Sequence, residues 1–265
     1  MDMPRNEFKR RLAAGEVQYG MWCSLADPLA AEICAGAGLE WVVIDGEHAP
    51  NDIRTVLAQL QAMAPYPVSP IVRLVRGDVA LMKQYLDLGA QTLLVPMVES
   101  ADQAAELVRG LRYPPRGVRG VANGRASRWG RVGTYWDDAD AENCLVVQVE
   151  TLPGVANIEA IAAVDGVDGI FVGPSDLAAC MGHLGNPRHP EVEAAVLDAL
   201  SRIRTAGTAA GVLTTDPEAA PAFVDAGATF IGIGVDLYLL ARGAEALARQ
   251  ARHTTDPTGS PEERP

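Results

Sequence analysis

The stretch WVVIDGEHAP, residues 41–50, joins four apolar residues directly to a cluster of polar ones. A short run rich in β-branched residues, without alternating polar positions, predicts a strand that is buried on both faces, as in a parallel sheet. Polar side chains at the carboxyl end of such a strand stand where parallel barrels form their active sites. The stretch therefore predicts a core strand that ends in functional residues.

Runs of this kind recur along the chain, so eight strands are expected, at 18–22, 41–45, 70–74, 92–95, 145–149, 169–172, 210–213 and 230–233. Helix-like segments follow them, near 28–37, 53–63, 79–88, 101–111, 154–164, 191–206, 217–226 and 237–252. Regular alternation of strands and helices predicts an α/β fold with a parallel sheet and right-handed crossovers. Eight such units favour a closed (β/α)₈ TIM barrel, with a doubly wound open sheet as the alternative.

The whole set of units is expected to form one domain, residues 1–252, because α/β barrels commonly reach this length as a single domain. Residues 253–265 are polar and rich in proline, so we expect a disordered tail there. The connection 112–143 is rich in glycine and arginine and is much longer than an ordinary loop. Its length indicates a functional or interfacial role.

The overall composition narrows the choice of partners. A formal net charge of −12 and a pI near 4.8 argue against nucleic acid or an anionic membrane surface, because both need a basic face on the protein. The four cysteines form no C-x-x-C pair, so we expect buried, reduced thiols and neither a disulfide framework nor a zinc knuckle. No apolar run reaches the roughly 18 residues that a membrane-spanning helix needs, and a soluble cytoplasmic protein is expected.

Two carboxylates follow neighbouring strands of the expected barrel, Glu150 after 145–149 and Asp176 shortly after 169–172. Together they could bind a hard cation such as Mg²⁺ or Mn²⁺ and leave positions open for water and substrate oxygens. Either residue alone could instead cap the N-terminus of a helix. The metal interpretation is favoured because other reactive residues are predicted on the same rim.

One of these reactive residues is His48, just beyond the strand 41–45. Asp45 could hold its imidazole through one nitrogen and leave the other nitrogen to move a proton. The alternative for His48 is a purely structural hydrogen-bonding role. Arg73, in the expected strand 70–74, offers a planar guanidinium to a carboxylate or an enolate oxygen, and its alternative role is an ion pair with a rim carboxylate.

The turn GPSD, residues 173–176, leads from a strand into a new segment, and its backbone N–H groups could bind a substrate carboxylate. The chain has no phosphate-binding loop and no complete dinucleotide motif, so no nucleotide cofactor is expected. Its two lysines, Lys9 and Lys83, do not lie at strand ends, where a Schiff-base lysine would be needed. Carbanion stabilisation is therefore expected to come from a metal.

A set of motifs, taken together, resembles one known family. The motifs are IDGEHAP at 44–50, VPMVES at 95–100, YPPRGVRG at 113–120, RASRWG at 125–130, QVET at 148–151 and FVGPSDLA at 171–178. In this order they are similar to the HpcH/HpaI family of metal-dependent class II pyruvate aldolases, such as the 4-hydroxy-2-oxoheptanedioate and 2-keto-3-deoxy-L-rhamnonate aldolases. The resemblance implies a TIM barrel of the phosphoenolpyruvate/pyruvate-binding type, in a homohexamer built as a trimer of dimers, whose last helix, 237–252, packs on a neighbouring subunit.

The resemblance also implies roles for the rim residues. Glu150 and Asp176 would bind the metal, which would be Mg²⁺, Mn²⁺ or Co²⁺, and pyruvate would chelate it through its carboxylate and keto oxygens. Arg73 would stabilise the enolate oxygen. His48, supported by Asp45, would act as the acid and base through a metal-bound water.

Further residues are implied to complete the site. Gln148 would make a hydrogen bond beside the metal ligands, and backbone groups of Gly173 and Ser175 would bind the pyruvate carboxylate. Leu213 would contact the substrate. Asp87 would reach the site of an adjacent subunit.

These interpretations predict a lyase that cleaves a 4-hydroxy-2-oxo acid into pyruvate, or a close 2-oxo acid, and an aldehyde. The same enzyme would catalyse the reverse aldol addition through a metal-bound enolate. One alternative is a citryl- or malyl-coenzyme A lyase, although such chains usually carry an extra C-terminal segment. Another is a non-catalytic barrel that binds a 2-oxo acid, against which the intact set of rim residues argues.

Overall fold

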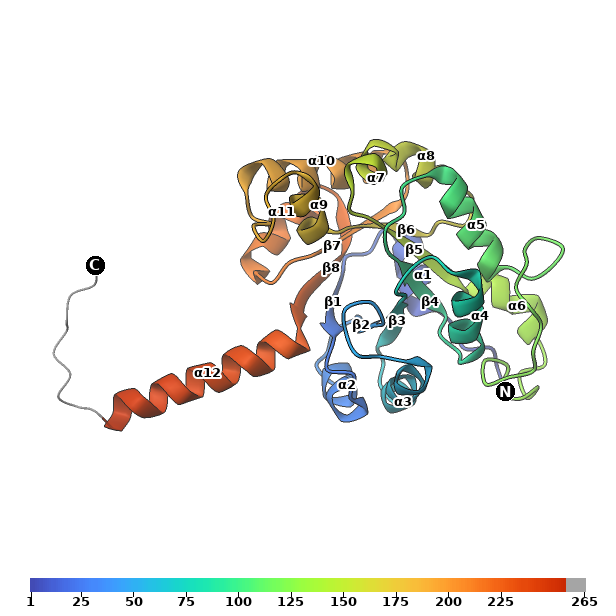
Figure 1. Cartoon of the computed structure of the whole chain (residues 1–265). Coiled ribbons are helices and arrows are strands. Elements are labelled where there is room, and N and C mark those ends of the chain that lie inside the picture. The colour runs from blue at the N-terminus through green and yellow to red at the C-terminus, as the bar shows by residue number, and fades with distance from the viewer. Residues whose placement is uncertain (256–265) are drawn as a thin grey trace.

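Eight parallel strands close into a barrel in the computed structural model, which describes residues 1–255 (Figure 1). Each strand pairs with its neighbours in chain order, and β1 closes the barrel against β8. The strands are β1 (Gln18–Cys23), β2 (Trp41–Asp45), β3 (Ser69–Arg73), β4 (Thr92–Val95), β5 (Cys144–Val149), β6 (Gly169–Val172), β7 (Ala209–Leu213) and β8 (Ala228–Val235). The predicted (β/α)₈ TIM barrel is thus confirmed, and the open sheet is excluded.

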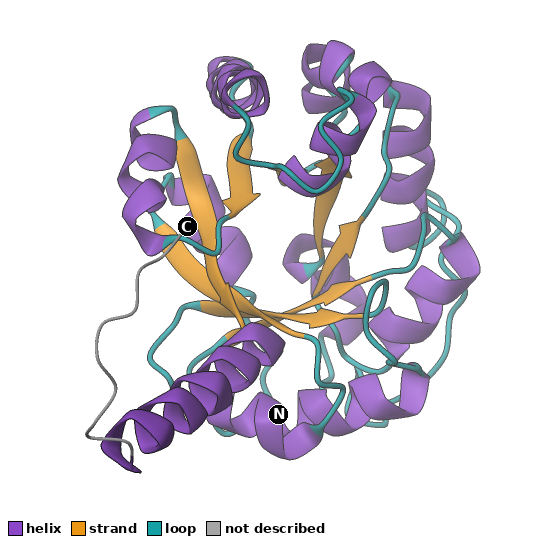
Figure 2. Cartoon of the chain, turned by 60° about the vertical axis from the view of Figure 1, so that its left-hand side comes forward, coloured by secondary structure: helices purple, strands orange, loops and turns teal. Residues whose placement is uncertain are grey.

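Most helices cover the outside of the barrel, and the last one projects from it (Figure 2). They are α1 (Glu7–Ala14), α2 (Pro28–Ala35), α3 (Ile53–Met63), α4 (Val79–Asp87), α5 (Ala101–Leu111), α6 (Tyr135–Glu142), α7 (Leu152–Ala156), α8 (Ile158–Ala162), α9 (Pro174–Cys180), α10 (Pro190–Thr205), the 3₁₀ helix η1 (Pro217–Ala219), α11 (Ala220–Asp225) and α12 (Asp236–Thr255). Aspartates begin several of them: the side chains of Asp27, Asp52 and Asp78 accept hydrogen bonds from the first backbone N–H groups of α2, α3 and α4. These local caps explain why the helices start where the sequence predicts.

The structure differs from the sequence-based expectation in three helices that were not predicted, α1, α6 and α9. The signals for α1 are local, since the side chain of Asn6 accepts a hydrogen bond from the N–H of Lys9 and Gly15 ends the helix with φ of 69°. The expected helix 154–164 is divided into α7 and α8, because Asn157 leaves the helical conformation between them.

Aromatic side chains fill the amino end of the barrel. The ring of Phe230 lies 5.6 Å from that of Phe8, 5.9 Å from that of Phe171 and 6.4 Å from that of Trp41, centroid to centroid. Glycine makes room for them, because a Cβ at Gly211 would lie 2.2 Å from the Phe230 ring. Since side chains close this end, the carboxyl end is left as the face on which a site can form.

Phe230→Ala is expected to lower the free energy of unfolding by about 3–5 kcal/mol, because the lost ring leaves a cavity among rigid neighbours. Phe230 is 1% exposed, whereas Leu184, the site of the matched control Leu184→Ala, is 83% exposed. Urea denaturation measures both differences, and the control should change stability by less than about 0.5 kcal/mol. Equal stabilities for the two variants would contradict this account of the core.

The last helix, α12, projects away from the barrel (Figure 1). Large apolar side chains along it are exposed: Leu237, Tyr238, Leu239, Leu240 and Leu247. The helix continues to Thr255, so the first three residues of the predicted tail 253–265 are helical, and the rest of that tail lies outside the described residues. Within residues 1–255, no helix is long and apolar enough to cross a membrane.

Candidate active site

Two carboxylates hold Arg73 at the carboxyl end of β3. The register of β2 and β3 places Asp45 beside Arg73, which donates from Nε to Asp45 Oδ1 at 3.0 Å and from Nη2 to Oδ2 at 2.7 Å. Its Nη1 lies 3.0 Å from Oε2 of Glu47. Burial by itself would raise the pKa of Asp45, but the hydrogen bonds and charge of Arg73 bring that pKa below its ordinary value. The guanidinium is therefore held in one orientation by the Asp45 carboxylate, with Glu47 on its other side.

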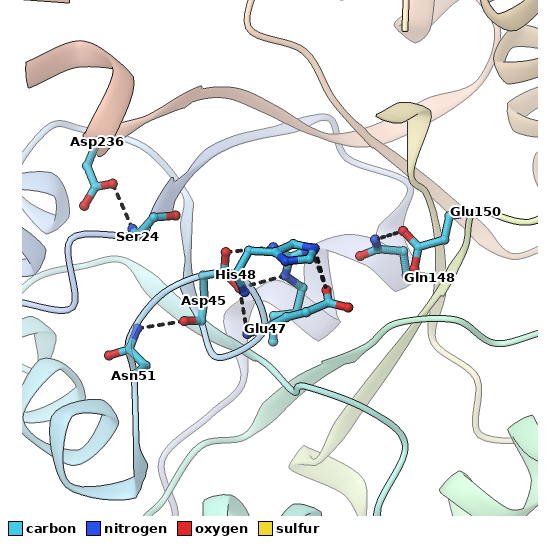
Figure 3. A network of polar contacts seen from close by, with 9 residues as sticks. Ser24, Asp45, Glu47, His48, Asn51, Gln148, Glu150 and Asp236 are labelled. Carbon is cyan, nitrogen blue, oxygen red and sulfur yellow. Dashed lines mark hydrogen bonds and ion pairs between the residues drawn. The ribbon is translucent and has the colours of Figure 1, made fainter. Parts of the chain in front are cut away.

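The predicted contact between Asp45 and the His48 imidazole is wrong. Asp45 Oδ1 accepts hydrogen bonds from the backbone N–H groups of Glu47 and His48, and both carboxylate oxygens bind Arg73. The imidazole lies beside Glu47 instead, with Nε2 3.8 Å from Oε2, and the His48 side chain is 65% exposed (Figure 3). The reason is that β-strand register presents Asp45 to the guanidinium, while the turn after β2 directs the imidazole outward.

Glu47 is a site residue that the sequence reasoning missed, although it stands between two predicted residues in the motif IDGEHAP. Its carboxylate is half-buried between Arg73 and His48. Burial raises the pKa of Glu47 above its ordinary value against the lowering effect of Arg73, and the charges of Asp45 and Asp176 raise it further. The signal for Glu47 was its position directly after a core strand.

Glu150 lies at the end of β5 and is 1% exposed. Its Oε1 accepts the N–H of Met97 at 2.9 Å, and its Oε2 accepts a short hydrogen bond from Gln148 Nε2 (Figure 3). Burial raises the pKa of Glu150 to about 7, and the charges of Asp176 and Glu47 contribute to the rise. An ionised carboxylate in this place therefore calls for a nearby positive charge.

Asp176 stands in the first turn of α9 and acts electrostatically on both Glu47 and Glu150, whose pKa values it raises. Neither Asp176 nor Glu150 caps a helix: α7 is capped by the Thr151 side chain, and α9 has Gly173 in its N-cap position and no side-chain cap. The capping alternative is therefore excluded for both. Glu47, Glu150 and Asp176 therefore form a group of carboxylates that repel one another at the carboxyl end of the barrel.

This group fits a hard divalent cation. Carboxylate oxygens are the ligands that Mg²⁺ and Mn²⁺ prefer, and a cation would offset the cost of ionising the buried Glu150. The Oε1 atom of Gln148 is buried with no hydrogen-bond partner among the described residues. Glycine at position 173 leaves room for the Glu150 side chain, because a Cβ at Gly173 would lie 2.5 Å from Glu150 Oε2. Glu150 and Asp176 are thus the residues that could hold the ion.

Three predicted residues remain, namely Ser175, Leu213 and Asp87. Ser175 and Leu213 both line a cavity of about 160 Å³ between α9, α10 and the end of β7, and Glu150 does not line it. Asp87 ends α4, at the amino end of the barrel, where Arg119 Nη2 donates to its Oδ1 at 3.0 Å. Within one chain, Asp87 therefore does not join the rim.

Acids, a guanidinium and a histidine gathered at the carboxyl ends of a closed parallel barrel define a (β/α)₈-barrel enzyme. Residues 18–243 match the family model described as HpcH/HpaI aldolase/citrate lyase, and the chain belongs to this family. The resemblance noted from the motifs is confirmed.

Individual relatives are similar over almost the whole chain. A protein of Pseudomonas aeruginosa named hydroxypyruvate/pyruvate aldolase is 59% identical, over 94% of this chain and 93% of its own. A protein of Klebsiella pneumoniae subsp. pneumoniae named 4-hydroxy-2-oxo-heptane-1,7-dioate aldolase is 52% identical, over 96% of each. The crystal structure of an HpcH/HpaI aldolase/citrate lyase family protein from Burkholderia cenocepacia J2315 has a TM-score of 0.90 and 43% identity, and covers 93% of this chain and 99% of that one.

Proposed function

We propose that this protein is a divalent-metal-dependent aldolase of the class II pyruvate type. It cleaves a 4-hydroxy-2-oxo acid into pyruvate, or a close 2-oxo acid, and an aldehyde, and it catalyses the reverse addition. The observation that carries the proposal is the group of buried acids around Glu150, next to an oriented guanidinium and an exposed imidazole. The relatives named above support it, because their names share a 2-oxo acid and an aldolase activity.

Each rim residue has a part in this reaction. A divalent cation held by Glu150 and Asp176, whether Mg²⁺, Mn²⁺ or Co²⁺, would supply positive charge where the 2-oxo acid becomes negative. Arg73 has five N–H donors, of which Asp45 and Glu47 engage three, so N–H groups remain that can donate to the substrate's keto oxygen. In our proposal Gln148 orients the Glu150 carboxylate.

The exposed imidazole of His48 is the group that we assign to proton transfer at the 4-hydroxyl of the substrate, since imidazole both accepts and donates protons near neutral pH. In our proposal no lysine forms an imine with the substrate, because both lysines lie away from the rim. Lys9 contacts Asn143 and Asp168 at the amino end of the barrel, and Lys83 belongs to α4. The coenzyme A lyase alternative has less support, because the relatives at 52–59% identity are named aldolases.

A panel of 4-hydroxy-2-oxo acids with different aldehyde parts tests the proposed function. We expect metal-dependent release of pyruvate, measured with lactate dehydrogenase, and the panel identifies the preferred aldehyde. Malyl- and citryl-coenzyme A are tested in parallel, and release of acetyl-coenzyme A is measured, because their cleavage forms no pyruvate. Cleavage of a coenzyme A ester without cleavage of any 4-hydroxy-2-oxo acid would establish the alternative lyase, and binding of 2-oxo acids without any turnover would establish the non-catalytic barrel.

We also propose a homohexamer, arranged as a trimer of dimers, in which α12 packs on a neighbouring barrel and Asp87 approaches a neighbouring site. The projection of α12 and its exposed leucines support this assembly, because large exposed apolar patches mark interaction surfaces. A cytoplasmic location, which the free cysteines favour, belongs to the same proposal.

The double substitution Leu239→Glu/Leu240→Glu is expected to reduce the assembly to smaller species, because it places charges on the apolar face of α12. Both leucines are more than 60% exposed in the single chain, at 63% and 62%, so the barrel itself should stay folded. Size-exclusion chromatography with light scattering measures the mass, and Leu184→Glu provides the control at an exposed leucine outside α12. A monomeric wild-type protein with full activity would refute the assembly.

A further inference from the structure

A second cluster of metal-ligand side chains lies apart from the rim carboxylates. The Sγ atoms of Cys23 and Cys34 and a carboxylate oxygen of Asp236 all lie within 4.8 Å of one another. They come from three elements, the end of β1, the helix α2 and the first residue of α12. Figure 3 shows Asp236 and its contact with Ser24 on the opposite side of the view from Glu150.

The cluster is buried, with Cys23 1%, Cys34 8% and Asp236 6% exposed. The two thiols share a hydrogen bond, which raises the pKa of Cys23 and lowers the pKa of Cys34, and Asp236 raises both. Among the described residues, no cationic side chain contributes to the pKa of either thiol. The two thiols and the Asp236 carboxylate, all of which can become anionic, therefore lie together with no cationic side chain shown to act on the thiols.

The Asp236 carboxylate can still coordinate a metal ion, because its hydrogen bonds leave acceptor positions free. Its Oδ1 accepts the backbone N–H groups of Ser24 at 2.8 Å and Leu237 at 2.6 Å, whereas its Oδ2 accepts only that of Leu25, at 3.2 Å. These hydrogen bonds fix the carboxylate next to the thiols. A carboxylate oxygen offers more than one acceptor position, so Oδ2 can also coordinate an ion.

We propose that Cys23, Cys34 and Asp236 bind a thiophilic divalent cation of the zinc class, at a site separate from the rim. Zn²⁺ accepts thiolate and carboxylate ligands in tetrahedral geometry, and these three residues leave the fourth position for water. Binding releases the thiol protons to solvent, because thiolates are the ligands. Mg²⁺ does not compete here, since it prefers an all-oxygen set.

The position of the site gives it a structural consequence. Asp236 is the first residue of α12, the helix that projects from the barrel, while Cys23 and Cys34 belong to β1 and α2. An ion at this point ties the base of α12 to the barrel wall. The bound ion therefore stabilises the direction in which α12 leaves the barrel.

Co²⁺ is the probe that distinguishes this site from the rim, because thiolate ligands give Co²⁺ an intense near-ultraviolet charge-transfer band and oxygen ligands do not. The experiment adds Co²⁺ to the full chain with Mg²⁺ in excess and a phosphine reductant. We expect a band that saturates at one Co²⁺ per chain and that Zn²⁺ removes. Cys34→Ser and Asp236→Asn should lose or greatly weaken the band, whereas Cys180→Ser should retain it.

Cys180 is the matched control because it is free but exposed, contrary to the expectation that all four cysteines are buried. A second measurement does not depend on how the variants fold: in the wild-type protein, Zn²⁺ should slow alkylation of Cys34 at least tenfold and leave Cys180 unchanged. Absence of the band from reduced wild-type protein would overturn the proposal. A band that survives Cys34→Ser, or equal alkylation of Cys34 with and without Zn²⁺, would overturn it as well.

Discussion

Glu150→Gln is expected to abolish cleavage of 4-hydroxy-2-oxo acids. The substitution keeps the size of the side chain but removes the negative charge at a buried position, and a hard divalent cation then loses one of its two proposed carboxylate ligands. Charge stabilisation by a catalytic cation amounts to several kcal/mol, so we expect kcat to fall by roughly 10³-fold or more. Treating the wild-type protein with a chelator should produce the same loss, which Mg²⁺, Mn²⁺ or Co²⁺ reverses in the wild type alone.

The stability of the metal-free protein shows whether Glu150→Gln loses activity through lost metal binding or through misfolding. Burial raises the pKa of Glu150 from 4.5 to about 7, so the folded protein binds this proton more tightly than the unfolded chain. The free energy of unfolding therefore declines as the pH rises from about 4.5 to about 7. Glu150→Gln lacks this decline and should be at least as stable as the metal-free wild type at pH 8.

Thermal denaturation at several pH values checks that stability, and Glu106→Gln on the exposed side of α5 is the control that should retain full activity. Isothermal titration with Mg²⁺ or Mn²⁺ measures the loss of metal binding directly. Full activity of the wild type in excess chelator, with its metal content verified as negligible, would refute a metal-dependent mechanism. Normal metal affinity of Glu150→Gln would assign Glu150 a structural role.

Arg73→Lys is expected to reduce kcat by roughly 10²–10³-fold, the usual cost of losing one donor that stabilises a developing oxyanion, about 2.7–4 kcal/mol. Lysine keeps the positive charge but cannot reproduce the planar fork that binds both oxygens of Asp45 and also reaches Glu47. If Arg73 only balanced the charge of these carboxylates, the substitution would cost little. The two roles therefore predict different results.

Two rates decide between these roles: kcat for aldol cleavage, and exchange of the pyruvate methyl protons with solvent deuterium. Both require the enolate, so both should fall together in Arg73→Lys while metal affinity persists. Arg76→Lys is the matched control, because Arg76 lies three residues after Arg73 and makes an exposed ion pair with Asp78. Near-normal proton exchange in Arg73→Lys would show that the enolate is stabilised without this residue.

The strands were predictable because each is an apolar run set between polar or glycine-containing turns. The bounds of β2, β4 and β6 agree with the expected ranges 41–45, 92–95 and 169–172. By contrast, α6 was hidden in the connection 112–143, where its acidic sequence YWDDADAE carries little helical periodicity. Its buried residues Tyr135 and Ala139 pack in a small separate cluster with Val132, and only the folded chain brings Met3 and Tyr113 against this cluster.

The sequence by itself determined the barrel and the end of it that carries the chemistry. Alternating strands and helices impose a parallel sheet, and the carboxyl ends of parallel strands meet at one rim. Glu150, Asp176, Arg73 and His48 could therefore be assigned to that rim, because each lies at or shortly after the end of a strand. This inference needed only local pattern and chain order.

Only the tertiary structure decided which of these side chains contact one another. Asp45 is three positions from His48 and 28 from Arg73, yet its side chain binds Arg73, because the register of β2 and β3 places the two side by side. Asp236 meets Cys23 across the barrel closure of β1 and β8, although more than 200 residues separate them. Strand register and barrel closure are properties of the whole folded chain, and so are the contacts that they create.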